Sequence, residues 1–466
     1  MRTMASISNH EGSSKKVKKL NNKGDRISSL PDSLLVHILS FLPTKYAVGT
    51  SILSSRWKHL WASVPTLDFD GKLTFKPHSD MTSSNFMNFI DRVLFNHESS
   101  CIQKFRLKCN GKTDLFRIYT LISVAVKRGV QELDIYIGSP GQDFDLPISL
   151  FTCPTLMVLK LGFDARFNVP CSAYFRSLRI LHVSIFFLDN DSMQNLMRNC
   201  PVLEDLSIEG MVPNNNEELI IDFSTPALKS LKLDFAAEEY SGVYGDKVVV
   251  NAPILEYLNL RDDYLPCYVL GDVTSLVKAD VDVGSCCIKI ESTKQHADRV
   301  LVILREICTV KYLSLGAGTM GALDYARDNE LLLFTNLIRL ELHVKDCYGW
   351  KSLLHLLNSM PNLVYLVFKK SECYYENDDS EDFNFVEHEV VVPCCLSMHL
   401  QEIEISEFRG LSDELRLIEY FLRNGSVLHK MTINSCNSVE KQEREELLKK
   451  LLMFRRGSIN CQILFL

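Results

Sequence analysis

Three glycines, Gly316, Gly318 and Gly321, stand in the spacing G-x-G-x-x-G within the stretch LSLGAGTMGAL. In a dinucleotide-binding enzyme, glycines at this spacing follow a buried strand and let the chain approach a pyrophosphate at the start of a helix. The preceding residues, TVKYLSL, alternate polar and apolar, whereas a strand buried on both faces would be apolar throughout. We therefore expect these glycines to form a turn that leaves a strand, and we keep a nucleotide-dependent enzyme as an alternative.

Other motifs of catalysis are absent from the sequence: it has no H-E-x-x-H, no P-loop and no G-x-S-x-G, and its twelve histidines are dispersed. His182 and His343 fall inside strand-like runs, where we expect surface or structural roles. The fifteen cysteines include no C-x-x-C pair. In a strand, the neighbours Cys286–Cys287 and Cys394–Cys395 would point to opposite faces and could not share a metal. We expect no catalytic residue, no metal site and no cofactor.

The composition is typical of a soluble globular protein, because 46% of the 466 residues are hydrophobic, 23% are charged and the net charge is −7. No apolar run reaches the roughly 18 residues of a membrane span, and the polar N-terminus lacks the apolar core of a secretory signal. Lys15–Lys19, KKVKK, is either a nuclear localisation signal or a basic solvated tail. We expect a protein of the nucleus and/or cytoplasm that binds neither nucleic acid nor membrane.

One apolar pattern recurs through the middle of the chain: an apolar residue followed by others three and five positions later. Most successive copies begin about 25 residues apart, within the period of leucine-rich repeats. Copies begin at Val130, Leu156, Leu178, Leu203, Leu228, Leu255, Val310, Leu337 and Leu363. Since the last two members differ by two positions, they lie on one face of a short strand.

A single strand cannot bury that face, but strands stacked side by side form a continuous parallel sheet with a shared leucine core. Five copies carry a proline two residues before their first apolar member, where it ends a helix and keeps the chain extended. These prolines are Pro154, Pro201, Pro226, Pro253 and Pro361. The pattern predicts an α/β fold in which residues 71–394 form a horseshoe-like solenoid with a parallel sheet.

Apolar residues also recur at helical spacing near the N-terminus, in DSLLVHILSFLP. Leu34, Ile38 and Leu42, with two further leucines between them, form one wide stripe bounded by prolines, which predicts a helix. Thr44 and Ser54 are candidate caps for a second and a third helix. Three short helices make a poor independent core, so part of the stripe docks on another protein or packs elsewhere in this chain.

Residues 25–70 closely resemble an F-box, the adaptor-binding module of ubiquitin ligase subunits, in the form common in plant proteins. The matches include DRI at 25–27, LP at 30–31, the residues between 38 and 43, and the pair Arg56–Trp57. Ser55 replaces a usual lysine. The resemblance implies a three-helix F-box that binds a Skp-type adaptor and, through it, a cullin. The residues implied in adaptor binding are Leu30, Pro31, Leu34, Ile38, Leu39, Leu42, Pro43, Val48 and Trp57.

Residues 395–466 are similar to the FBD domain that ends many plant F-box proteins with leucine-rich repeats. Ile403, Ile405, Met431 and Ile433 continue the strand pattern, and apolar residues between 415 and 452 form two helical stripes. We expect this segment to cap the solenoid. The acidic stretch 376–389 is expected to be a mobile loop, with contact to a basic target as the alternative, and residues 1–24 a disordered basic tail.

These features predict a non-catalytic adaptor. The F-box would join a Skp-cullin ubiquitin ligase, and the repeats would hold a target protein near the ubiquitin-conjugating enzyme. Polar residues between the core positions would line the concave strand face, among them Lys160, Ser207, Lys232, Asn259 and Glu341. Which of them bind the target is left open. The alternatives are a repeat scaffold without ligase function and the nucleotide-dependent enzyme.

Overall fold

The structure is a computed structural model of the 466-residue chain. It describes residue 27 and residues 29–74, 82–109, 114–138, 144–163, 168–187, 190–212, 220–237, 246–263, 266–284, 293–326, 333–345, 352–371, 392–436 and 441–466. Several expectations fall outside the described residues: the tail 1–24 with Lys15–Lys19, the cysteines at 286 and 287, and the acidic stretch 376–389.

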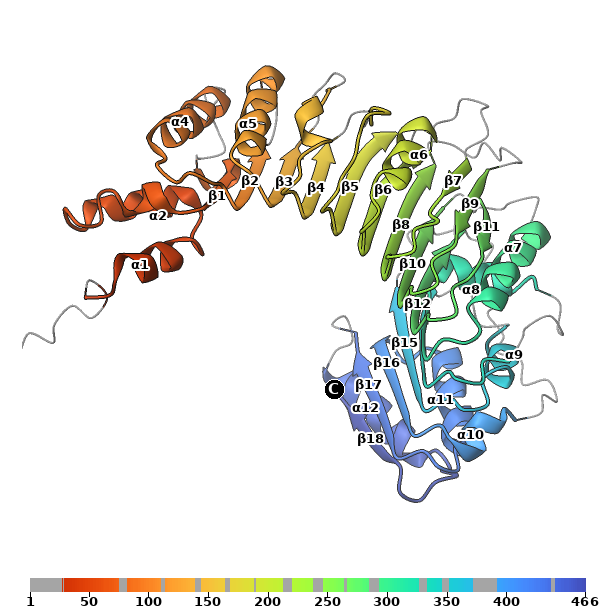
Figure 1. The fold of residues 1–466 in the computed structure, drawn as a ribbon. Helices are drawn as coiled ribbons and strands as arrows, with labels where there is room; N and C mark the ends of the chain where they lie inside the picture. Colours follow the sequence, from red (N-terminus) through yellow and green to blue (C-terminus); the bar gives the residue numbers. More distant parts are fainter. Residues whose placement is uncertain are drawn as a thin grey trace, which may run out of the picture.

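Within the described residues, fifteen parallel strands form one curved sheet that begins beside the N-terminal helices and continues to the C-terminal end of the chain (Figure 1). Its strands follow one another in chain order. They are β1 (Thr66–Asp70), β2 (Lys104–Cys109), β3 (Glu132–Ile137), β4 (Val158–Phe163), β5 (Ile180–Phe187), β6 (Asp205–Val212), β8 (Ser230–Ala237), β10 (Tyr257–Asp262), β12 (Lys278–Val283), β13 (Tyr312–Leu315), β14 (Arg339–Lys345), β15 (Tyr365–Ser371), β16 (Glu402–Phe408), β17 (Lys430–Ser435) and β18 (Gln462–Phe465). The predicted solenoid with a parallel sheet is confirmed.

The recurring apolar pattern supplies the core of the solenoid. Leu133 on β3 lies beside Leu159 on β4, which lies beside Leu181 on β5, and all three side chains are fully buried. The first member of a copy, such as Leu156, is also buried and precedes its strand. Burial of one leucine contributes about 1.5–3 kcal/mol, so each repeat is stabilised mainly by its neighbours.

Three further copies of the pattern complete the series, and the sequence did not reveal them. Their core positions hold phenylalanine, isoleucine, valine or alanine in place of most leucines, which concealed the spacing. The copies are Val64, Leu67 and Phe69 at β1, Ile102, Phe105 and Leu107 at β2, and Leu276, Ala279 and Val281 at β12. The range 25–70 therefore contains the first strand of the sheet as well as the N-terminal helices.

Prolines in front of the strands occupy tight turns. The Leu203 N–H donates to the Cys200 carbonyl across Pro201 at 3.3 Å, and the Leu255 N–H donates to the Ala252 carbonyl at 3.0 Å in the same way. The fixed φ of proline suits the second residue of such a turn. The prolines thus set the point at which each connector becomes a strand.

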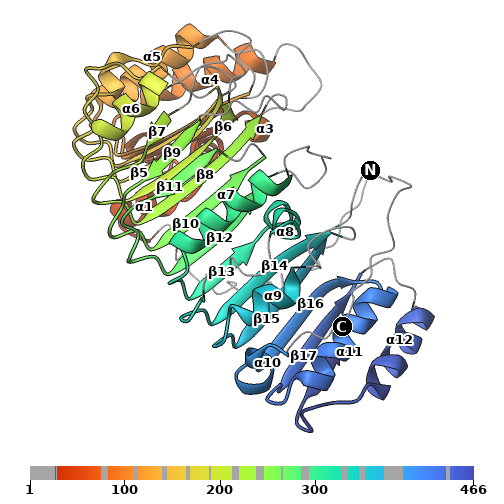
Figure 2. The same cartoon turned by 90° about the vertical axis from the view of Figure 1, so that its right-hand side faces the viewer.

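Helices and a small second sheet cover the outer side of the main sheet (Figure 2). The helices are α3 (Gly71–Thr74), α4 (Thr82–Asn96), α5 (Leu115–Lys127), α6 (Asn190–Arg198), α7 (Thr293–Glu306), α8 (Ala317–Leu323), α9 (Leu353–Asn358), α10 (Cys394–Met398), α11 (Ser412–Asn424) and α12 (Lys441–Met453), with a 3-10 turn η3 (Ile148–Leu150). The second sheet contains β7 (Ile220–Asp222), β9 (Lys247–Val250) and β11 (Cys267–Leu270). In β9, the β-branched run KVVV favours a strand over a helix. No described helix is long and apolar enough to cross a membrane.

An N-terminal helical module, residues 29–64, precedes the first strand. It contains α1 (Asp32–Leu39), α2 (Thr44–Gly49) and the 3-10 segments η1 (Thr50–Ile52) and η2 (Leu60–Ser63). The third α-helix expected after Ser54 is wrong, because residues 55–59 form turns that lead into η2. Trp57 lies in these turns and Leu60 begins η2, and both side chains are buried.

The C-terminal segment extends the solenoid with the same kind of unit. β16, β17 and β18 join the sheet in parallel, with Ile403, Met431 and Ile463 in one row. The two apolar stripes expected in this segment form α11 and α12. The cap is therefore built from βα units that continue the core.

Candidate functional site

The glycine motif opens a short helix, so the expected turn is wrong. Gly316 precedes α8, and Gly318 lies within its seven residues. A Cβ atom on Gly318 would stand 1.9 Å from the Gly284 carbonyl oxygen, and one on Gly316 would overlap the Asp282 side chain. Glycine is required at both positions because α8 packs directly against the end of β12.

A carboxylate of the chain itself occupies the start of α8. Asp282 Oδ1 accepts the Gly318 N–H at 3.0 Å, in the position where a bound phosphate would lie in a nucleotide-binding fold. The Thr319 hydroxyl donates to the Val281 carbonyl at 3.1 Å and accepts the Val283 N–H at 2.9 Å. These bonds fix α8 to β12 and give the glycine motif a structural role.

The residues implied in adaptor binding fall into three groups. Leu34, Ile38 and Leu42 are 48%, 44% and 37% exposed, and Pro31 is also exposed. Leu30, Pro43 and Val48 are half-buried. Leu39 and Trp57 are buried in the core of the helical module.

The module exposes more apolar residues than those that the family resemblance implies in adaptor binding. Phe41, Tyr46, Ile52 and Leu53 are 74%, 49%, 89% and 63% exposed. Sequence reasoning missed them because they lie outside the helical stripe, in the connection between helices, on α2 and at the end of η1. The only sequence signal was the density of large apolar residues in a segment too short to bury them.

The module is held together by a small apolar core and by an ion pair at its surface. Leu35, Leu39, Ala47, Trp57, Leu60 and Val64 form that core. The Arg56 guanidinium donates to Asp32 Oδ1 at 2.6 and 3.0 Å and to the Leu30 carbonyl at 2.5 Å. Arg56 thereby joins the turn after Ser54 to the start of α1.

Polar contacts attach the helical module to β1 and to the residues that follow α4. The Thr44 hydroxyl accepts the Asp68 N–H of β1 at 2.7 Å, and the Glu98 N–H donates to the Ala62 carbonyl at 2.9 Å. His97 Nε2 lies 2.8 Å from the Val64 carbonyl. Val48 and Trp61 also pack against the core of the solenoid. The module is thus fixed to the first repeats at several points.

The opposite face of the strands carries the polar residues that alternate with the core. The five concave-face residues expected from the sequence lie in one row across the sheet. Through the strand register, Lys160 is followed along this row by His182, Ser207, Lys232, Asn259, Asp280, Ser314 and Glu341. Their placement on a common surface is confirmed, and binding by these residues stays a prediction.

Charged residues at the N-terminal end of this face neutralise one another. Arg106 on β2 lies 3.5 Å from Asp68 on β1 and 3.3 Å from Asp134 on β3. Beside it, Lys104 pairs with Glu132 at 2.9 Å. Such pairs on adjacent strands join the repeats and leave little unmatched charge for a ligand.

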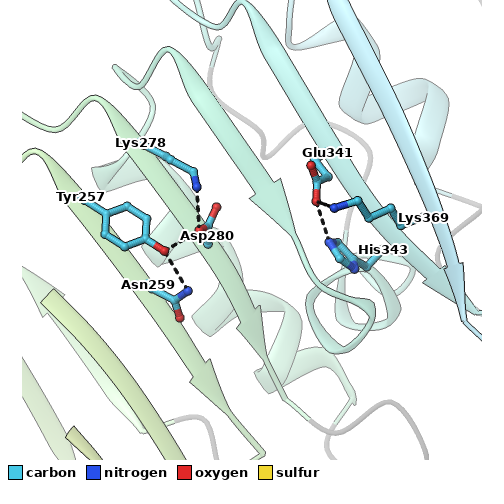
Figure 3. Close-up of polar contacts among 7 residues, drawn as sticks. All are labelled: Tyr257, Asn259, Lys278, Asp280, Glu341, His343 and Lys369. Carbon is cyan, nitrogen blue, oxygen red and sulfur yellow. Dashed lines mark hydrogen bonds and ion pairs between the residues drawn. The ribbon is translucent and has the colours of Figure 1, made fainter. Parts of the chain in front are cut away.

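A polar cluster connects β10 and β12 in the second half of the face (Figure 3). The Tyr257 hydroxyl donates to Asp280 Oδ2 at 2.7 Å and accepts from the Asn259 amide at 3.1 Å. Lys278 Nζ lies 3.2 Å from the same Asp280 oxygen and 5.0 Å from the centre of the Tyr257 ring. Burial, together with Asp280, raises the pKa of Tyr257 to about 12, so the phenol remains a hydrogen-bond donor at neutral pH.

A second cluster joins β14 and β15 and borders an open hollow. Glu341 Oε1 accepts from Lys369 Nζ at 2.5 Å and lies 3.1 Å from His343 Nε2 (Figure 3). Burial acts to raise the pKa of Glu341, but Lys369 and His343 outweigh it and the pKa is lowered. The hollow, about 520 Å³, extends from Asn259 on β10 to His343 on β14. The described residues contain no group of three His, Cys, Asp or Glu side chains placed to hold a metal.

An α-helical module with exposed apolar residues, fixed to a curved parallel solenoid with a polar inner face, defines an F-box protein with leucine-rich repeats. Family models match each part: the F-box domain at residues 27–68, the leucine-rich repeats of FBD-associated F-box protein At5g56370 at 119–279, and FBD at 388–433.

Relatives of known sequence match nearly the whole chain. F-box/FBD/LRR-repeat protein At1g78750 of Arabidopsis thaliana is 33% identical over 96% of this chain and 99% of its own length. Putative F-box/FBD/LRR-repeat protein At5g22670, from the same organism, is 34% identical over 94% of this chain and 97% of its own length. The chain belongs to the F-box/FBD/LRR-repeat family.

Proposed function

We propose that this chain is the target-recognition subunit of a Skp-cullin-F-box ubiquitin ligase and carries out no bond chemistry itself. One observation carries the proposal. On α1, Leu35 and Leu39 are buried, while Leu34 and Ile38 remain about half exposed beside Phe41 and Leu42. Contiguous exposed apolar residues of this kind indicate a protein-binding surface.

The proposed mechanism is a gain in effective concentration. The helical module would bind a Skp-type adaptor and, through it, a cullin that brings the ubiquitin-conjugating enzyme. The inner face of the repeats would hold the target. Because Thr44, Ala62 and Val64 bind the module to the first repeats, the adaptor and the target would be held at a fixed separation.

Capture of a purified plant Skp-type adaptor by the full-length protein tests this proposal. We expect Leu34→Glu combined with Ile38→Glu to abolish capture, because both changes place charge on the docking surface and neither residue belongs to the core of the module. The matched control is Ile148→Glu, which changes an apolar residue 66% exposed at η3. Undiminished capture by the double variant would contradict the proposal.

A repeat scaffold without ligase function is the second candidate. Its signature is a folded wild-type protein that captures no Skp-type adaptor. The proposed ligase role would place the protein in the nucleus and/or the cytoplasm, which imaging of a fluorescent fusion in plant cells tests.

A further inference from the structure

We propose that the hollow between β10 and β14 binds a carboxylate side chain of the target protein, an aspartate or glutamate, through the guanidinium of Arg339. This inference rests on the proposed function and names the chemistry of the target segment. The argument starts from one row of side chains along the edge of the hollow.

That row alternates aromatic and cationic residues. In the register of the sheet, Tyr257, Lys278, Tyr312, Arg339 and Tyr365 lie side by side on five consecutive strands, β10, β12, β13, β14 and β15. Tyrosine and arginine are the residue types that most often dominate binding energy at protein interfaces. Tyr312 is 41% exposed and lines the hollow together with Arg339.

Both carboxylates that line the hollow are already bound. Asp280 accepts from Tyr257 and Lys278, and Glu341 accepts from Lys369 and His343 (Figure 3). The Arg339 guanidinium, in contrast, forms no hydrogen bond or ion pair with any residue that the structure describes, and only the backbone N–H of Arg339 donates, to the Lys311 carbonyl. The two acids therefore contribute to the architecture of the hollow, and Arg339 is its available charged donor.

The position of Arg339 differs from that of the arginine at the other end of the sheet. Arg106 has an aspartate on each neighbouring strand. Arg339 has a tyrosine on each neighbouring strand, Tyr312 and Tyr365. The first arrangement neutralises the guanidinium within the chain, whereas the second leaves it for an anion from outside.

The charge of the hollow fits a single carboxylate. The lining residues and their ion-pair partners comprise four permanent cations, Arg261, Lys278, Arg339 and Lys369, and three carboxylates, Asp234, Asp280 and Glu341. One excess positive charge is balanced by one carboxylate, which a guanidinium can bind with two parallel hydrogen bonds. A phosphate carries a larger negative charge and would require a further donor that is not committed to a partner.

A random peptide library displayed on phage, selected on the purified full-length protein, tests the inference. We expect the wild type to enrich peptides containing aspartate or glutamate, Arg339→Gln to lose that enrichment, and Arg339→Glu to favour lysine and arginine. The matched control is Arg416→Gln, an exposed arginine on α11. Each variant should keep the wild-type melting temperature and the wild-type capture of the adaptor, and these two measurements separate a loss of peptide binding from a loss of the fold or of the proposed ligase function.

Synthetic copies of an enriched peptide identify the group that binds. Replacing its acidic residue by glutamine should weaken binding by about 10- to 100-fold, as for loss of a charged hydrogen bond. Replacing that residue by phosphoserine should also weaken binding, and tighter binding would overturn the carboxylate assignment. Failure to enrich any peptide, enrichment without acidic residues, or equal enrichment by Arg339→Gln would overturn the inference, even if the adaptor is captured.

Discussion

The Lys370 ammonium on β15 donates to the Glu414 carboxylate on α11 at 2.6 Å, and each side chain is only 7% exposed. The other oxygen of Glu414 accepts the backbone N–H groups of Arg409, Gly410 and Leu411 at 3.1, 2.8 and 3.0 Å. Gly410 has a φ of +80°, which permits the chain to fold around this oxygen. One carboxylate thus joins the last central repeat to the C-terminal segment.

Replacing Glu414 by alanine should therefore destabilise the C-terminal half strongly. Because it leaves Lys370 charged and three N–H groups without their acceptor, we expect a loss of about 3–5 kcal/mol in the free energy of unfolding. Urea unfolding measures this loss. Glu419→Ala, at an exposed position on the same helix, should change the free energy by less than about 0.5 kcal/mol, and similar losses for the two variants would contradict the assignment.

Neighbouring residues of α1 should separate stability from adaptor binding. Leu39 is 1% exposed, so Leu39→Ala should lower the free energy of unfolding by about 2–5 kcal/mol. Ile38 is 44% exposed, so Ile38→Ala should leave the melting temperature nearly unchanged and weaken adaptor capture. Calorimetry combined with adaptor titration distinguishes the two, and an unstable Ile38→Ala protein would show that this side chain supports the fold.

Gly318→Ala should destabilise the protein through a steric clash. The new methyl group would meet the Gly284 carbonyl, so we expect a loss of about 3 kcal/mol, at the upper end of the usual cost of overpacking. The control is Gly49→Ala, where a Cβ has no neighbour within 4 Å and stability should hold or rise slightly. Titration of the wild type with a nicotinamide dinucleotide should show no saturable binding, because Asp282 occupies the start of α8.

Acidification should weaken the contact between the helical module and the first repeats. Burial and the neighbouring Arg128 lower the pKa of His97 below 6.5. The hydrogen bond to the Val64 carbonyl acts to raise this pKa, but its effect is smaller than theirs. A second proton would go to Nδ1, which lies 3.0 Å from an Arg128 nitrogen. The unfolded chain therefore takes up this proton first, and the stabilisation present above pH 6.5 is lost as the pH falls towards the lower folded-state pKa.

The urea concentration at the midpoint of unfolding, measured at several pH values from about 7.5 to about 5, tests this loss of stability. This pH range spans the reference histidine pKa of about 6.5. His97→Gln should remove part of the pH dependence of the wild type. His429→Gln, at an exposed position just before β17, is the control and should keep that dependence. An unaltered profile in His97→Gln would show that His97 does not sense pH.

The sequence predicted the features that depend on spacing along the chain. Leucines three and two positions apart identified the strands, and the stripe in DSLLVHILSFLP identified α1. The spacing could not show which side of α1 packs into the core of the helical module. Leu35 and Ile38 are both apolar, but only Leu35 is buried. The copy at β12 was missed because Ala279 stands where most copies have leucine.

Contacts between distant residues could not be predicted in this way. The pairing of Glu341 with Lys369 depends on the register between β14 and β15, and Asp282 reaches Gly318 only because α8 folds back on β12. The turns after Ser54 were also missed, since the spacing of Trp57 and Leu60 also suits an α-helix. Local pattern identifies elements, whereas three-dimensional packing decides which polar residues meet.

Because the strands follow one another in chain order, the number of strands between two sites fixes their distance along the sheet. Arg339 lies on β14, ten strands beyond β1 and therefore roughly 48 Å along the sheet from the helical module, at the usual spacing of about 4.8 Å per strand. Insertion or removal of a single repeat would move a target held there by about 5 Å relative to the adaptor, with no change in either binding surface. If the protein acts in a ubiquitin ligase as proposed, the number of repeats would select which part of a bound protein lies within reach of the ubiquitin donor.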